Sequence, residues 1–240
     1  MTSSTPSWQN WGRTESATPA RVVAPASVDE LAGLVAGTRG RPASVRAIGS
    51  GHSFSGIGTP VGVQVELSGM RGLVKVDGDR ATFRAGTYLW EIPALLEPHG
   101  LAMANLGDID RQTLAGAIST GTHGTGLRFG GISTQVTEVT LVTGTGEVRT
   151  LNRPAELAAA ALGLGALGII VEITVACVPA FSIEAVEQSE RIDDVLASLP
   201  ASIAGNDHFE FYWFPHTEAA LTKRNRRLPG LAPASGPSRA

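Results

Sequence analysis

The sequence predicts a mixed α+β fold, in which a strand–helix–strand unit is followed by antiparallel strands. Two short apolar strands, at residues 21–24 and 44–48, flank a segment with helical periodicity. Residues 73–86 alternate between apolar and polar side chains around Asp77-Gly78, a dipeptide typical of tight hairpin turns. Further strands are expected at residues 134–143, 147–151 and 168–178.

Two helices are predicted between these strands. The first follows Ser27, which forms a capping box with Glu30. Its apolar face consists of Leu31, Leu34 and Val35. The second begins after Thr87 and ends at Gly100, with Pro93 in its first turn or at a kink. Its inward residues are Leu89, Ile92, Leu95 and Leu96.

Composition excludes several classes of function. The 240 residues are 42% hydrophobic, which suffices for a core, and 19 basic against 22 acidic residues leave a net charge of −3. No nucleic-acid partner is therefore expected. The one cysteine, Cys177, excludes an internal disulfide, and we expect it in the core. No metal site, leader or membrane-spanning segment is predicted, so we expect a cytoplasmic protein, with peripheral membrane association left open.

The segment RAIGSGHSFSGIG, at residues 46–58, places a histidine in a glycine-rich loop at a strand end. Glycine permits positive φ and lets the backbone approach a ligand closely. Open α/β structures bind ligands at such strand ends. A Rossmann site is not indicated, because the third glycine of its fingerprint would fall at Phe54. The sequence also lacks GxxxxGK[ST], HExxH and CxxC motifs.

A second glycine-rich segment, NLGDIDRQTLAGAISTGTHGTG, covers residues 105–126. Successive backbone N–H groups in such turns can hold a diphosphate without any lysine, because oriented amide dipoles supply the positive field. A flexible Gly/Thr loop is the alternative interpretation. Taken alone, His123 is more typical of a hydrogen-bonded histidine than of a catalyst.

Together the two loops resemble the flavoprotein oxidoreductases of the vanillyl-alcohol oxidase type. The similarity is to the branch of sugar-1,4-lactone oxidases (L-gulonolactone and D-arabinono-1,4-lactone oxidases) and alditol oxidases, and it covers about residues 11–227. Its specific parts are IGSGHSFSGI, the segment 105–126 and LGALGII, which ends at Ile170. HFEFYWFPHTEAALTKRNRR, at residues 208–227, is similar to actinobacterial members.

The resemblance implies FAD as cofactor, held in a PCMH-type FAD-binding domain. The positions matched to cofactor-binding residues are Ala47, Ile48, Gly49, Ser50, Gly51, His52, Ser53, Asp108, Thr113, Gly116, Thr120, Gly121, Thr122, His123 and Ile170. It further implies a covalent histidyl–FAD bond through His52, the alternative being a turn histidine beside a noncovalent flavin. Asp108 stands where alditol oxidases have a serine facing flavin and substrate, and Gly107 stands where a small residue governs dioxygen access.

The implied domain organisation is an N-terminal extension (1–16), an FAD-binding domain of two α+β subdomains (17–179, divided at about 70 and 71), an incomplete substrate domain (180–227) and a disordered tail (228–240). We expect a truncated chain that lacks the main catalytic groups, with Asp108 and Asp110 as the first candidate bases present. The implied reaction is oxidation of a CH–OH group in a sugar lactone or polyol, with hydride transfer to flavin N5 and O2 or another redox acceptor. The alternatives are a flavin-binding fragment without turnover and a noncovalent flavin reductase of the same fold.

Overall fold

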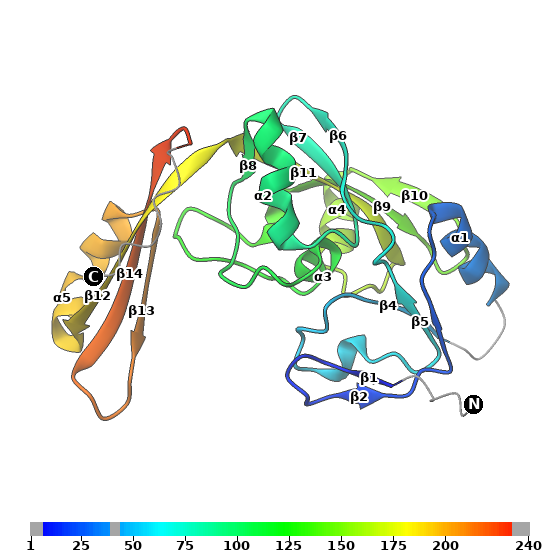
Figure 1. The fold of residues 1–240 in the computed structure, drawn as a ribbon, viewed down its shortest axis with the longest axis horizontal. Helices are drawn as coiled ribbons and strands as arrows, with labels where there is room; N and C mark the ends of the chain where they lie inside the picture. Colours follow the sequence, from blue (N-terminus) through cyan, green and yellow to red (C-terminus); the bar gives the residue numbers. More distant parts are fainter. Residues whose placement is uncertain (1–6, 39–43, 232–240) are drawn as a thin grey trace.

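The structure is a computed structural model that describes residues 7–38 and 44–231 of the chain. Strands and helices are mixed throughout, which confirms the predicted α+β class (Figure 1). A two-part region carries three sheets, and a fourth sheet, covered by one helix, stands beside it (Figure 1). No helix in the described part of the chain is long and apolar enough to cross a lipid bilayer.

The first part is a small parallel sheet with strand order β3-β5-β4. Its elements are β3 (Arg21–Val23), α1 (Val28–Gly37), β4 (Val45–Ile48) and β5 (Val63–Glu66). Ser27 caps α1 by accepting a hydrogen bond from the Glu30 N–H, and the Glu30 carboxylate accepts one from the N–H of Ala26. The predicted strand–helix–strand unit is therefore present, and its second strand, β4, leads directly into the glycine–histidine loop.

A short N-terminal hairpin lies against that loop. It consists of β1 (Trp8–Gln9) and β2 (Ser16–Ala17), which pair antiparallel. Strands this short carry no periodicity that could predict them. Residues 7–16, placed in an extension at the sequence level, are thus ordered structure, whereas residues 1–6 lie outside the described part.

The larger part is a six-stranded antiparallel sheet with the order β10-β9-β11-β7-β6, in which β8 also pairs with β11. Its strands are β6 (Leu73–Asp77), β7 (Arg80–Arg84), β8 (Leu101–Met103), β9 (Val136–Val142), β10 (Val148–Leu151) and β11 (Ile169–Pro179). The hairpin at Asp77-Gly78 forms as predicted, with Gly78 at φ 59°. Phe83, Val139 and Ile173 are fully buried in this sheet and anchor its core.

The helix predicted between Thr87 and Gly100 is divided into three pieces. They are the 3-10 turn η2 (Leu89–Glu91), α2 (Ile92–Leu96) and the 3-10 turn η3 (Glu97–His99). Pro93 and Pro98 lack an N–H donor, so a continuous helical ladder cannot form. The predicted apolar face is nevertheless buried, with Leu89, Ile92 and Leu96 at 1% exposure or less.

Two helices that the sequence analysis did not identify pack close to the large sheet: α3 (Leu114–Ser119) and α4 (Pro154–Ala161). Burial of Leu114, Ala117 and Ile118 supports α3 despite its weak helix propensity. Cys177 is buried in the sheet as predicted, and burial raises the pKa of its thiol to about 11.

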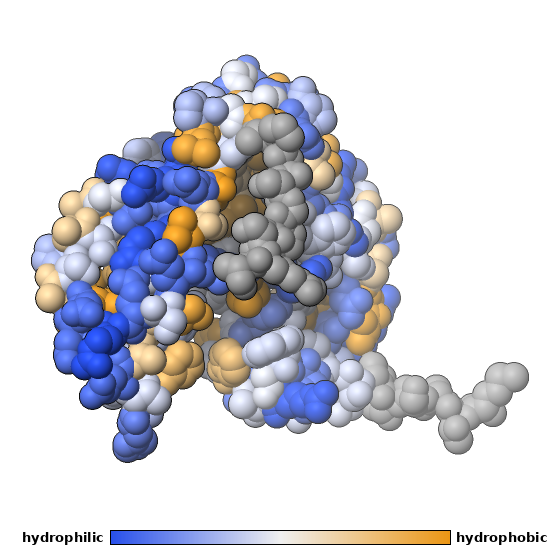
Figure 2. Space-filling model, turned by 60° about the vertical axis from the view of Figure 1, so that its left-hand side comes forward, coloured by the Kyte–Doolittle hydropathy of each residue, from blue (hydrophilic) through white to orange (hydrophobic). Residues whose placement is uncertain are grey.

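The fourth sheet has the order β12-β14-β13. Its strands are β12 (Phe181–Arg191), β13 (His208–Trp213) and β14 (Ala219–Pro229), and helix α5 (Ile192–Gly205) connects β12 to β13. Helix α5 packs on one face, and the opposite face is turned towards the rest of the molecule (Figure 1). Figure 2 shows apolar patches on the molecular surface interrupted by hydrophilic residues. Leu228 and Pro229, assigned to the tail at the sequence level, end β14, and residues 232–240 lie outside the described part.

Candidate functional site

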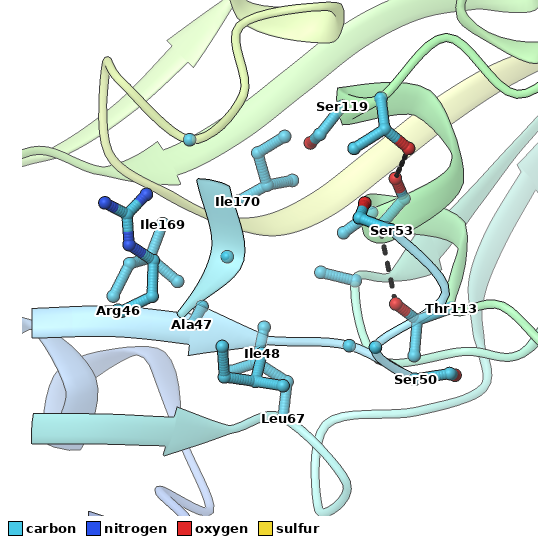
Figure 3. A pocket seen from close by; sticks show the side chains of 18 of the residues that line it. Arg46, Ala47, Ile48, Ser50, Ser53, Leu67, Thr113, Ser119, Ile169 and Ile170 are labelled. Atoms are coloured by element: carbon cyan, nitrogen blue, oxygen red, sulfur yellow. Dashed lines mark hydrogen bonds between the residues drawn. The ribbon is translucent and has the colours of Figure 1, made fainter. Parts of the chain in front are cut away.

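A cavity of about 720 Å³ opens between the small parallel sheet and the α3 end of the large sheet. Three segments supply most of its lining: residues 45–53, residues 112–120 and residues 163–170. Figure 3 shows Ile48 and Leu67 on one side and Ile170 on the opposite side. The volume falls in the range of pockets that hold small molecules and cofactors.

Close packing explains Gly49, and backbone conformation explains Gly51, the two glycines before His52. A Cβ atom at Gly49 would lie 2.6 Å from Thr113 Oγ1, so only glycine lets the end of β4 approach the start of α3. Gly51 adopts φ +67°, in the left-handed region that disfavours other residues. The loop is therefore built to bring main chain, not side chains, to the cavity.

The same loop has unused hydrogen-bonding groups. The backbone N–H groups of residues 50–53 donate to no other described residue. Ser50 Oγ is buried and likewise has no partner among the described residues. Because Ser50 Oγ is buried, and buried polar groups are rarely left unpaired, these groups indicate a ligand with acceptor atoms.

The start of α3 differs from the expectation for this segment. Thr113 caps the helix by accepting a 3.2 Å hydrogen bond from the Gly116 N–H. The N–H groups of Leu114 and Ala115 donate to the carbonyls of Thr87 and Ala85. These amides, expected to hold a diphosphate, already have partners, whereas the backbone N–H groups of residues 50–53 in the glycine–histidine loop donate to nothing in the described part of the chain.

Ile170 closes the cavity from the large sheet. It is buried on β11 and lines the cavity after a turn that contains Gly165 at φ 74° and Gly168 at φ 147°. A register shift in the pairing of β11 with β9 follows directly, between Ile170 and Glu172. Such bulges commonly redirect a strand beside a binding site.

His52 lines the cavity and is partly exposed. Its imidazole stacks on the indole of Trp11, with ring centroids 5.5 Å apart and planes 17° apart. Neither ring nitrogen has a hydrogen-bond partner within residues 7–38 and 44–231. Both nitrogens are thus free to react or to bind.

Among the sequence-predicted site residues, the structure gathers one group around the cavity. These residues are Ala47, Ile48, Gly49, Ser50, Gly51, His52, Ser53, Thr113, Gly116, Thr120 and Ile170. The second group, outside the cavity lining, is Gly107, Asp108, Gly121, Thr122 and His123. Gln112 connects the two groups, since it lines the cavity and donates a 3.0 Å hydrogen bond to Thr122 Oγ1.

Asp108 belongs to an ionic cluster that bridges to the fourth sheet. Lys223 Nζ on β14 lies 2.9 and 3.0 Å from the two carboxylate oxygens of Asp108 and 3.3 Å from Glu210 Oε1 on β13. Burial works against the charge of Lys223, but the hydrogen bonds to the two carboxylates outweigh it and raise its pKa. The negative charge of Glu210 raises the pKa of the neighbouring Tyr212.

The fourth sheet is attached beside this cluster through Arg227. Its guanidinium lies 4.3 Å from the ring centroids of both Phe129 and Phe181, and it donates to the carbonyl of Ala104. Desolvation is the main cause that lowers the pKa of Arg227. The His208 ring stacks on Phe129 at 5.0 Å. This junction holds the inner face of the sheet against residues 104–129.

Several lining residues were not predicted from the sequence. Arg46, Gln64, Glu66, Gln112 and Ser119 contribute polar groups to the cavity, and the glycines of residues 163–168 form its far wall. The repeated glycines in LGLGALG were the available signal for that wall. Lys223 and Glu210 were missed as well, although His208, Glu210 and Tyr212 alternate as inward residues of a strand do.

Comparisons with known proteins agree with this geometry. Residues 19–152 match the profile of the FAD binding domain, and residues 173–238 match that of D-arabinono-1,4-lactone oxidase. The chain therefore belongs to the FAD-binding domain family.

Its curated relatives include L-gulono-1,4-lactone dehydrogenase of Mycobacterium tuberculosis, 38% identical over 92% of this chain and 52% of the relative. L-gulonolactone oxidase of Bos taurus is 34% identical over 88% of this chain and 49% of that protein. The chain thus spans about half the length of these relatives. Cholesterol oxidase from B. sterolicum has a similar fold, with a TM-score of 0.81 at 20% identity, over 93% of this chain and 47% of that structure.

The residues around the cavity fit an FAD molecule. The free N–H groups of residues 50–53, Ser50 Oγ and the Arg46 side chain are suited to phosphate and hydroxyl oxygens. Ile48, Leu67 and Ile170 offer apolar surface for aromatic rings (Figure 3). A Cβ at Gly49 would meet Thr113 and force apart the loop and α3 beside this space. Donors and apolar walls are therefore combined as a dinucleotide requires.

Proposed function

We propose that this chain is the flavin-binding part of an oxidoreductase that oxidises a CH–OH group of a sugar-1,4-lactone. One observation carries the proposal: residues 50–53 line the cavity of an FAD-binding domain, and their backbone N–H groups and the buried Ser50 Oγ have no partners among the described residues. The substrate class is supported by the relatives, which are named as acting on L-gulono-1,4-lactone or as L-gulonolactone oxidase.

The bound flavin supplies a two-electron acceptor for the hydride of the alcohol carbon. The chain holds it through the residue 50–53 amides, Ser50 and Arg46, and shields it with Ile48 and Ile170. O2 or another redox acceptor then removes the electrons. Gly107 is the proposed residue for dioxygen access; it carries no side chain, and a Cβ there would pack 3.0 Å from the His123 carbonyl oxygen.

We further propose that His52 attaches the cofactor covalently. Attachment would join a ring nitrogen of His52, which would give up its proton, to the 8-methyl carbon of a bound flavin, which would give up one hydrogen. Dioxygen would take up the two electrons and two protons and become hydrogen peroxide. Two features support His52 as nucleophile: it lines the cavity, and its ring nitrogens have no competing partner within the described ranges.

The inner face of the fourth sheet is the proposed substrate side. Glu210 on β13 lies opposite Lys223 on β14, and both side chains are only 21% exposed. Lys223 also pairs with Asp108, which is more exposed. A cluster that combines a cation with two carboxylates offers both donors and acceptors to the hydroxyl groups of a sugar. Asp108 is the proposed proton acceptor within it, and hydrogen bonds from Lys223 Nζ hold its carboxylate in place.

The purified chain, incubated with FAD, provides the test. Because the main catalytic groups are expected outside this chain, it should bind FAD, and L-gulono-1,4-lactone should not reduce the bound flavin under anaerobic conditions. Reduction by the lactone, faster than by a sugar alcohol, would instead show that the groups around Asp108 suffice for turnover. A chain that binds no FAD would contradict the proposed function. His52→Ala should still bind FAD, because the residue 50–53 amides remain, but acid should release all of it. Release of all flavin from the wild type would contradict the covalent bond.

A further inference from the structure

The N-terminal hairpin grips the backbone on both sides of His52. The N–H of Trp11 donates a 2.8 Å hydrogen bond to the carbonyl of Gly51. The side-chain amide of Asn10 donates a 2.9 Å hydrogen bond to the carbonyl of Ser53. The residues before and after His52 are therefore held by two adjacent residues of one hairpin.

Asn10 is an unusually well-satisfied buried side chain. It is 3% exposed. Its amide nitrogen donates to Thr14 Oγ1 and to the Ser53 carbonyl, and its oxygen accepts from the N–H groups of Thr14 and Glu15, all at 2.9 to 3.0 Å. A side chain that uses all of its hydrogen-bonding capacity has a single orientation. Asn10 thus fixes the turn of the hairpin and the far side of the His52 loop together.

Trp11 presents its ring to His52 at the surface. It is 65% exposed, which is unfavourable for a tryptophan unless contacts hold it in place. The ring stacks on His52 and meets Phe54 edge-on, at 6.0 Å and 90°. A Cβ at Gly12 would lie 2.6 Å from the Phe54 ring, so glycine is needed there for the three rings to assemble.

Among the described residues, stacking on Trp11 is the ring contact that orients the His52 side chain. Its nitrogens make no hydrogen bond to other described residues, so no polar partner selects its ring plane. The indole of Trp11 covers one face of the imidazole and leaves the in-plane nitrogens free. The direction in which a nitrogen lone pair points therefore depends on Trp11.

We propose that Trp11 and Asn10 are positioning residues for the covalent attachment of flavin at His52, an inference that rests on the proposed function. Attachment requires a ring nitrogen to meet the 8-methyl carbon while that carbon loses a hydrogen, with dioxygen as the oxidant that becomes hydrogen peroxide. Such bond formation depends steeply on alignment. Asn10 holds the backbone of the loop and Trp11 holds the plane of the ring.

The test uses the full chain as wild type, Trp11→Leu, Trp11→Phe and Asn10→Ala. Trp213→Leu is the matched control, because Trp213 is 50% exposed on β13 and has no ring contact with His52. Each protein is incubated with FAD in air, and the flavin that stays with acid-precipitated protein is compared with total bound flavin. Melting temperatures report folding. In flavin-free protein from riboflavin-limited cells, NMR follows the His52 ring protons, identified with His52→Ala.

We expect Trp11→Leu to slow covalent attachment about tenfold without changing total bound FAD. Trp11→Phe, which can still stack, should remain within about twofold of the wild type, and Trp213→Leu should match it. The His52 ring protons should shift in Trp11→Leu and Asn10→Ala and stay in place in Trp213→Leu. If Asn10→Ala fails to fold, Trp11→Leu decides.

Covalent flavin in the wild type and equally fast attachment in Trp11→Leu would overturn the positioning role and leave the proposed function standing. Unmoved His52 resonances in Trp11→Leu would also overturn it. A wild type that binds FAD without any covalent product would instead show that the attachment proposed for His52 is wrong, and the positioning role would fall with it.

Discussion

Replacing Gly49 by alanine tests how the cavity is built. The added Cβ would lie 2.6 Å from Thr113 Oγ1, which is 0.8 Å short of the 3.4 Å at which ordinary contact begins. Thr113 must then turn away and lose the hydrogen bond that caps α3. Loss of a cap costs about 1 kcal/mol and overpacking about 1–3 kcal/mol, so Gly49→Ala should lower the free energy of unfolding by about 2–4 kcal/mol.

A double mutant isolates the cause. Thr113→Ala removes the clashing oxygen and leaves Thr113 Cβ at 3.7 Å from the new methyl group, an ordinary contact. Gly49→Ala combined with Thr113→Ala should therefore lose only about 1 kcal/mol, the cost of the cap alone. Gly33→Ala is the matched control, because a Cβ on this residue of α1 meets nothing within 4 Å and should stabilise by about 0.5–1 kcal/mol.

Urea unfolding followed by circular dichroism measures the wild type and the four variants, and FAD titration shows whether the site survives. Additive losses in the double mutant would refute the contact between Gly49 and Thr113. A Gly49→Ala protein as stable as the wild type would refute the packing on which the description of the cavity depends.

Three further outcomes are expected. Gly107→Ala should slow the reoxidation of photoreduced flavin by air, and an unchanged rate would remove Gly107 from oxygen access. The pKa of Asp207 is lowered, chiefly by the hydrogen bond from the Arg227 N–H and also by Arg128, although burial opposes the shift. The Asp207 carboxylate therefore stabilises the fold at pH values above the ordinary aspartate pKa. That stabilisation is lost as the pH falls through the lowered pKa of the folded protein. Asp207→Asn should therefore be about 1 kcal/mol less stable by urea unfolding at neutral pH, with a gap that closes in acid; a gap independent of pH would contradict this. Cys177, whose thiol pKa burial raises to about 11, should react with a thiol reagent at neutral pH only after unfolding, and rapid reaction of the native protein would be inconsistent with its burial.

Local signals in the sequence were sufficient for much of the fold. The Ser27 capping box and the Asp77-Gly78 turn are decided by residues within a few positions of one another, and both form as predicted. The helical segment after Thr87 was located correctly, but its division into three pieces was not predicted. Burial of Leu89 and Leu96 keeps the segment helical in each piece, whereas the two prolines prevent one continuous helix. Helix α3 was missed because tertiary burial, not propensity, supports it.

The site was harder to predict, since it depends on contacts distant in the chain. The loop at residues 47–53 was located from its glycines. The sequence could not show that the first amides of α3 are already hydrogen-bonded, because the Leu114 N–H donates to the carbonyl of Thr87 only in the folded chain. The Lys223 cluster requires β14 to pair with β13 and then to approach Asp108, 115 residues earlier. Trp11 meets His52 for the same reason, and no local pattern in the hairpin indicates that stacking.

The visible absorption spectrum of the purified chain, recorded before and after denaturation, tests most directly whether the cavity behind His52 binds FAD. We predict the spectrum of oxidised flavin in the native protein and yellow colour that stays with the protein after acid precipitation. A protein that remains colourless after incubation with FAD and removal of the excess would contradict the account.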